Sequence, residues 1–243
     1  MADIKTCYRG SMLMIKSIPH EVLTEILAKV ASSSLADHLN VNQTCKFFHE
    51  VAQDDFILRH ASLDEVPVIQ WTSKAEVASF LKRCEHAQNP EVLYRQGMVE
   101  FFYNNQIELG RELLQRSSNS GHTVATYVLG IIFLDSGDNQ SILRGRELLN
   151  RILTKRSNNE RSRGEDVEEC RRKSRRVIRQ LWVNNSLNPS NPSQSQACNS
   201  SRCTTSQKNV NGWSSDYEDM SDCEICRCNR EFSHFIKMVL GVN

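Results

Sequence analysis

The chain has 243 residues, a length that corresponds to one large domain or two small ones. Hydrophobic residues make up 39% of it, and 30 Lys and Arg balance 29 Asp and Glu, so the net charge by itself indicates no partner. No segment resembles a signal peptide, and the longest apolar stretch, Tyr127–Leu134, is too short to span a bilayer. We therefore expect no membrane partner.

Three short helices are predicted near the start of the chain. The first runs from Pro19 to Val30, where proline suits the first helical position because its missing N–H costs nothing there. Ser34 can cap a second helix, and a third follows at residues 44–53. One face of the first helix carries the following apolar side chains: Val22, Leu23, Ile26, Leu27 and Val30. A unit of this size is near the lower limit for a stable core, so its apolar surface calls for a partner.

The middle of the chain contains an internal repeat. After a helix at 74–86, Asn89 and Pro90 begin another helix. The sequence YRQG at 94–97 recurs as YVLG at 127–130, and GRELL at 110–114 recurs identically at 145–149, which gives offsets of 33 and 35. A period near 34 residues with two helices per unit is typical of helical-hairpin arrays, whose stacked units form protein-binding surfaces.

The last third of the chain changes in composition. Residues 153–183 contain a basic loop and then a helix that caps the repeats, residues 184–222 are polar and predicted to be disordered, and residues 223–243 form a cysteine-rich tail with a short helix at 232–240. The residues of the capping helix expected to point inward are Val167, Cys170, Val177, Ile178, Leu181 and Trp182.

Nine cysteines are present, and with no secretory signal we expect free thiols or metal ligands instead of disulfides. Cys198 with Cys203 and Cys223 with Cys226 form two chelating pairs that together supply the four soft ligands of one structural zinc ion. Cys228 and His234 are substitutes. A set of free surface thiols stays open as the alternative.

The segment RRKSRR, at Arg171–Arg176, has two interpretations. It has the composition of a nuclear import signal or a phosphate-binding stripe. Glu168 with Arg172 and Glu169 with Lys173 are also spaced for i,i+4 ion pairs, which favours a solvated face of the capping helix.

Residues 15–60 resemble the F-box, a small three-helix module that opens with Ile-Pro and carries Ile-Leu and a C-K-x-F pattern. The resemblance implies binding to the Skp adaptor of a cullin-based ubiquitin ligase. The residues that match positions packing the module or facing the adaptor are Pro19, Ile26, Leu27, Cys45 and Phe48.

Residues 89–152 resemble two Sel1-like repeats, which are relatives of the tetratricopeptide hairpin. An F-box followed by such repeats is similar to a plant group of F-box proteins that end in a tail of the form C-x-x-C-R-x-x-R-E. The tail of this chain matches at Cys223, Cys226, Arg227, Arg230 and Glu231.

We therefore expect an all-α protein with an N-terminal tail (1–14), an F-box (15–60), a linker with a packing helix (61–88) and two repeats (89–152) before the C-terminal segments. No set of residues stands at catalytic spacing, so we expect a substrate-recruiting subunit, located in the nucleus or cytoplasm, and not an enzyme. The alternatives are a zinc-dependent nucleic-acid-binding nuclear protein and a repeat scaffold with a non-functional F-box.

Overall fold

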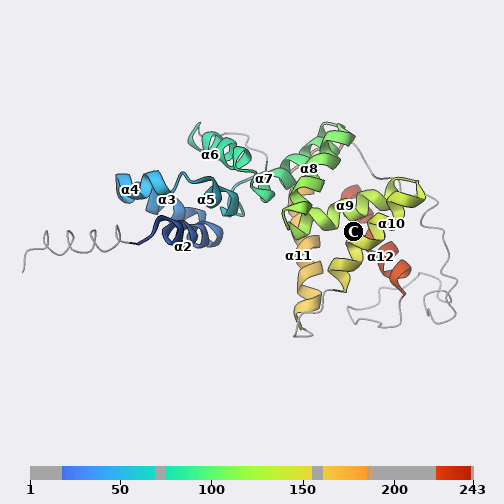
Figure 1. Cartoon of the computed structure of the whole chain (residues 1–243). Coiled ribbons are helices and arrows are strands. Elements are labelled where there is room, and N and C mark those ends of the chain that lie inside the picture. The colour runs from blue at the N-terminus through green and yellow to red at the C-terminus, as the bar shows by residue number, and fades with distance from the viewer. Residues whose placement is uncertain (1–17, 69–74, 155–160, 185–186, 188–222, 242–243) are drawn as a thin grey trace, which may run out of the picture. The chain divides into compact units, whose positions relative to one another are not determined.

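The computed structural model describes residues 18–68, 75–154, 161–184, 187 and 223–241, and every regular element in these ranges is a helix, which confirms the predicted all-α class (Figure 1). The chain divides into two compact units, residues 1–92 and 93–243. The predicted N-terminal tail and nearly all of the predicted disordered segment lie outside the described residues.

The first three predicted helices are present as α2 (His20–Ser33), α3 (Leu35–Thr44) and α4 (Lys46–Val51). The Ser34 side chain accepts the backbone N–H of Asp37 at 3.1 Å, which is the predicted cap of α3. Helix α2 continues three residues beyond the predicted end at Val30, because its last turn buries Ala31 in the core of the unit.

Helix α5 (Asp55–His60) was not predicted, yet it is the main packing partner of α2. Asp54 caps α5 by accepting the backbone N–H of Phe56 at 2.8 Å, a local signal present in the sequence. Ile57 and Leu58 are buried with Leu23 and Leu27 in one hydrophobic cluster. The N-terminal unit is therefore larger than the predicted three helices.

Asn89 connects the end of α5 to the start of α7 (Pro90–Met98), which follows α6 (Ala75–His86). Its Oδ1 accepts the backbone N–H of Glu91 at 3.0 Å, as predicted for a cap, and its Nδ2 donates to the carbonyl oxygens of Leu58 at 2.8 Å and Ala61 at 3.0 Å. The side chain is buried and uses its donor and acceptor groups on two elements.

The repeat prediction is confirmed as two helical hairpins. The first pairs α7 and its π-helical continuation η1 (Val99–Tyr103) with α8 (Ile107–Asn119), and the second pairs α9 (Thr123–Asp135) with α10 (Asn139–Leu153). A Cβ added at Gly97 or at Gly130 would lie 2.8 Å from the Cγ of Leu114 or of Leu149, respectively. The two glycines are thus equivalent, and each is needed because the paired helix approaches too closely for a side chain.

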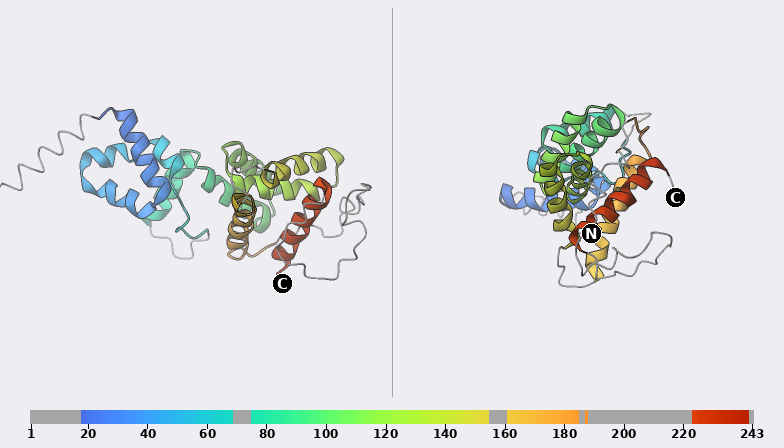
Figure 2. Two further views of the ribbon diagram at one scale, coloured as in Figure 1. Left: turned by 90° about the horizontal axis from the view of Figure 1, so that it is seen from below. Right: turned by 90° about the vertical axis from the view of Figure 1, so that its right-hand side faces the viewer.

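Helices α11 (Arg161–Ile178) and α12 (Glu224–Leu240) complete the second unit, where α12 packs against α9, α10 and α11 (Figure 2, red). The predicted inward-facing residues of the capping helix are buried with one exception. Trp182 is 81% exposed; α11 ends at Ile178, so helical spacing does not set the direction of this side chain. Helix α12 begins eight residues earlier than the predicted helix at 232–240.

Candidate functional site

The N-terminal unit exposes half of the apolar face of α2. Successive residues of a helix are about 100° apart around its axis, so Ile26 lies about 40° from Val22. Leu23 and Leu27 lie about 100° and about 140° from Val22. Leu23 and Leu27 are buried, but Val22 and Ile26 are each 46% exposed. The unit therefore covers only the Leu23–Leu27 side of the face and leaves Val22 and Ile26 as an exposed apolar stripe.

The five residues predicted for adaptor binding occupy different environments. Pro19 is exposed and directly precedes α2, and its carbonyl oxygen accepts the N–H of Leu23 at 3.1 Å. Ile26 lies on the exposed stripe, whereas Leu27 belongs to the core. Cys45 directly precedes α4 and is half-buried, as is Phe48, whose ring centroid lies 5.7 Å from that of Phe47.

Two further apolar side chains of this unit are exposed and were not predicted as site residues. Leu39 on α3 is 38% exposed, and Phe56 on α5 is as exposed as Ile26. Sequence analysis assigned Leu39 to no site and did not predict α5. With Val22 and Ile26, these two are the large apolar side chains that the described part of the N-terminal unit exposes.

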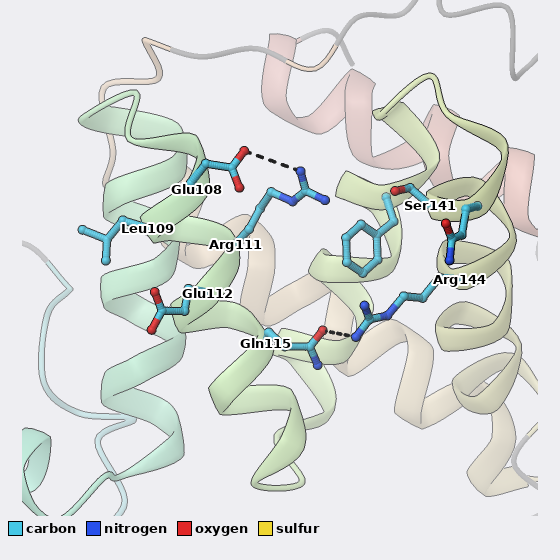
Figure 3. Close-up of a pocket in the computed structure, with 9 residues that line it drawn as sticks. Glu108, Leu109, Arg111, Glu112, Gln115, Ser141 and Arg144 are labelled. Carbon is cyan, nitrogen blue, oxygen red and sulfur yellow. Dashed lines mark hydrogen bonds and ion pairs between the residues drawn. The ribbon is translucent and has the colours of Figure 1, made fainter.

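The second unit has a groove of about 570 Å³ between α8 and α10, the second helices of the two hairpins (Figure 3). Arg111 lies on α8 and Arg144 on α10, and the guanidinium carbon of each lies 5.1 Å from the ring centroid of Phe133 on α9. Sequence analysis predicted a binding surface on the repeats but did not identify these residues.

Helix α12 is joined to the repeats by a buried polar network. Glu231, whose side chain is 4% exposed, accepts hydrogen bonds from Arg171 Nε at 3.1 Å and Nη2 at 2.5 Å and from the hydroxyl of Tyr127 at 3.2 Å. Burial raises the pKa of Tyr127 well above its ordinary value, and the charge of Glu231 raises it further, so the phenol stays protonated and donates. The tail is therefore an integral part of the second unit.

This network bears on the two interpretations of Arg171–Arg176. Arg171 is bound to Glu231, and it also lies 3.2 Å from Glu168. Glu169 pairs with Arg172 at 2.6 Å and with Lys173 at 3.7 Å, the latter being one of the predicted i,i+4 pairs. These contacts favour the solvated helix face over a free basic stripe.

The structure describes only one of the two cysteine pairs predicted to bind zinc. Cys223 and Cys226 are both half-buried at the start of α12, whereas Cys198 and Cys203 lie outside the described residues. Cys228 is buried near Asn150, and burial raises the pKa of its thiol to about 12, which disfavours the thiolate that a metal requires. Among the described residues, no group of three His, Cys, Asp or Glu side chains is arranged to hold a metal ion.

Comparison with protein families agrees with this architecture. Residues 15–64 match the F-box-like model, and residues 63–179 match the model of plant tetratrico peptide repeats. The chain thus combines an F-box-like region with plant-type tetratricopeptide repeats, which confirms the resemblance seen in the sequence, with a tetratricopeptide label in place of the related Sel1-like one.

The relatives of the chain carry F-box names. It is 31% identical to the F-box protein At1g67340 of Arabidopsis thaliana over 131 residues, which are 53% of this chain and 35% of that protein. The chain is also 26% identical to At1g67623 of Arabidopsis thaliana, which is named provisionally as an F-box protein. This match extends over 152 residues, which are 63% of this chain and 50% of that relative. No solved structure matches the chain. Within the described residues, no helix is long and apolar enough to cross a membrane.

Proposed function

We propose that this chain is a substrate-recruiting F-box subunit of a cullin-based ubiquitin ligase of the SCF type. The N-terminal unit binds the Skp adaptor, and through it a cullin, while the repeats bind a target protein. The chain itself performs no chemistry; it raises the local concentration of the target near a separate ubiquitin-conjugating enzyme. The match of residues 15–64 to the F-box-like model and the F-box names of the relatives support this assignment.

The observation that carries the proposal is the exposed stripe of α2. Burying a Val or Ile side chain stabilises a complex by about 1.5–3 kcal/mol when the residue moves fully out of water. Val22 and Ile26 are about half exposed before binding, so about half of that stabilisation remains available for a partner. Leu27 cannot contribute in the same way, because it is already buried in the core of the unit.

The experiment is a pull-down of a purified Skp adaptor by the full chain and by matched variants. Replacing Val22 and Ile26 with Ala should weaken adaptor binding by at least tenfold and leave the helical circular dichroism spectrum unchanged. Leu143→Ala is the control, since Leu143 is an even more exposed apolar residue (63%) that lies in the second unit. Leu27→Ala should instead lower the stability of the N-terminal unit by about 2–5 kcal/mol. A folded Val22/Ile26 variant that binds as well as wild type would rule out the stripe as the adaptor site.

A structural zinc ion is a separate part of the proposal. Cys223 and Cys226 stand three residues apart at the start of a helix and are both half-buried, and each would coordinate zinc as a thiolate. We expect Cys198 and Cys203 to supply the other two ligands.

A further inference from the structure

The groove between the two hairpins has a cationic and aromatic centre. Arg111 extends into the groove from α8 and Arg144 extends into it from α10 (Figure 3). The guanidinium carbons are equally distant, at 5.1 Å, from the ring centroid of Phe133. Phe133 is buried and comes from α9, so three helices of the array build this site.

The surroundings hold both arginines in place without using all their donors. Arg144 donates from Nη2 to Gln115 Oε1 at 2.6 Å, and Arg111 forms an ion pair with Glu108 at 3.8 Å that is too long for a hydrogen bond. A guanidinium has five N–H donors, and stacking on an aromatic ring restricts its rotation. The pair is therefore prepared to bind a carboxylate, the group whose geometry best matches a planar guanidinium.

A second groove of this unit differs in its lining. It measures about 470 Å³ between α10 and α12, and Arg146, the counterpart of Arg111 in the repeated GRELL, lines it together with Arg151. Its lining includes no aromatic side chain. At the offset of 33 residues, the first hairpin has Glu100 in place of Phe133. Of these two grooves, the α8–α10 groove is the one that combines two arginines with an aromatic ring.

We propose that the α8–α10 groove binds a peptide segment through an aspartate or glutamate side chain, whose carboxylate accepts hydrogen bonds from the guanidinium groups of Arg111 and Arg144 that lie against the ring of Phe133. Leu109, at the rim and 41% exposed, contacts an apolar neighbour of that acidic residue. Glu108 and Glu112 also line the groove, so its two arginines and two glutamates balance in charge and the groove does not attract polyanions such as nucleic acid. The inference rests on the proposed function only in taking the peptide to belong to a target protein.

The test uses the full chain and a phage-displayed library of random twelve-residue peptides. Selection on the wild-type chain should enrich Asp or Glu at one position beside an apolar residue. The best peptide is then synthesised in three forms, with the acidic residue unchanged, replaced by its amide, or replaced by phosphoserine, and binding is measured by isothermal titration calorimetry. The protein variant is Arg111→Gln with Arg144→Gln, and its matched control is Arg151→Gln, which removes an exposed arginine of α10 from the other groove.

The acidic peptide should bind the wild-type chain and the Arg151 control equally, and the double variant or the amide peptide should reduce affinity at least tenfold. A thermal melt like that of wild type shows that the double variant is folded; if it is not, the single variants Arg111→Lys and Arg144→Lys, which keep the charge and lose the planar fork, should each weaken binding. Equal affinity for the acidic and amide peptides, stronger binding of phosphoserine, or no enrichment of acidic residues would overturn the proposal. The Skp pull-down with the same variants separates the two proposals, because loss of peptide binding should leave adaptor binding unchanged.

Discussion

Replacing Arg171 with Met tests whether the buried network holds α12 on the repeats. The substitution leaves the carboxylate of Glu231 without its cation in a site where that side chain is 4% exposed. Two unit charges about 4 Å apart attract each other by about 4 kcal/mol at an effective dielectric constant near 20. Removing one partner of a buried pair costs about 3–5 kcal/mol. We therefore expect α12 to open far more often in the variant.

The assay is hydrogen–deuterium exchange of the backbone amides of α12 in the full chain. A cost of about 3–5 kcal/mol lowers protection by about two to three and a half orders of magnitude, since each tenfold change corresponds to about 1.4 kcal/mol. The control is Arg172→Met on the same helix, because Arg172 is 59% exposed and its pair with Glu169 contributes at most about 1 kcal/mol. It should lower protection less than about fivefold.

The charges can also be removed together. Changing Arg171 and Glu231 to Met and Tyr127 to Phe leaves no unpaired polar group of the network, and it should restore most of the protection that Arg171→Met loses. The reasoning would be refuted if the amides of α12 were as well protected in the Arg171→Met variant as in the Arg172→Met variant. It would also be refuted if the triple variant were as unprotected as Arg171→Met, because the loss would then come from packing and not from an uncompensated charge.

Three further predictions concern packing, pH and metal. Gly130→Leu should lower the melting temperature of the second unit, because a Cβ alone would already lie 2.8 Å from Leu149 Cγ; an unchanged melt would contradict close helix contact. Burial, and then the charge of Arg83, lowers the pKa of His38 below its ordinary value of 6.5. The unfolded chain therefore binds a proton at His38 more readily than the folded chain does, and the free energy of unfolding should fall as the pH drops below about 6.5. His38→Gln should flatten that decline in melts between about pH 7.5 and about pH 5.5, and an equally steep decline would exclude His38 as the cause. The chain purified under reducing conditions should contain about one zinc ion by mass spectrometry, and Cys223→Ser with Cys226→Ser should remove it; metal-free wild type would end the zinc hypothesis.

The apolar face of α2 shows where prediction from sequence reached its limit. The spacing of its residues correctly predicted an amphipathic helix, because helical periodicity is a property of the chain itself. The same spacing could not distinguish Leu27, which is buried, from Ile26, which is exposed. That difference depends on α5, whose Ile57 and Leu58 lie some thirty positions further along the chain and cover only the Leu27 side.

The buried network and the groove could not be predicted from the sequence either, because their residues are far apart along the chain. Glu231 was visible only as one letter of a tail motif, and its contacts with Arg171 and Tyr127 join residues 60 and 104 positions apart.

Trp182 was wrongly predicted to lie in the core because the end of α11 was not recognised in the sequence.

The sequence by itself determined the helical class, the caps at Ser34 and Asn89 and the two hairpins with their equivalent glycines. These features depend on neighbours within a few residues or on a repeated pattern, so local chemistry is sufficient to specify them. Only the tertiary structure decided which half of an apolar face is exposed, which charges are paired and that Arg111 and Arg144 line one groove. Burial and Coulomb attraction depend on distance in space, and the chain brings these residues together only when its helices pack.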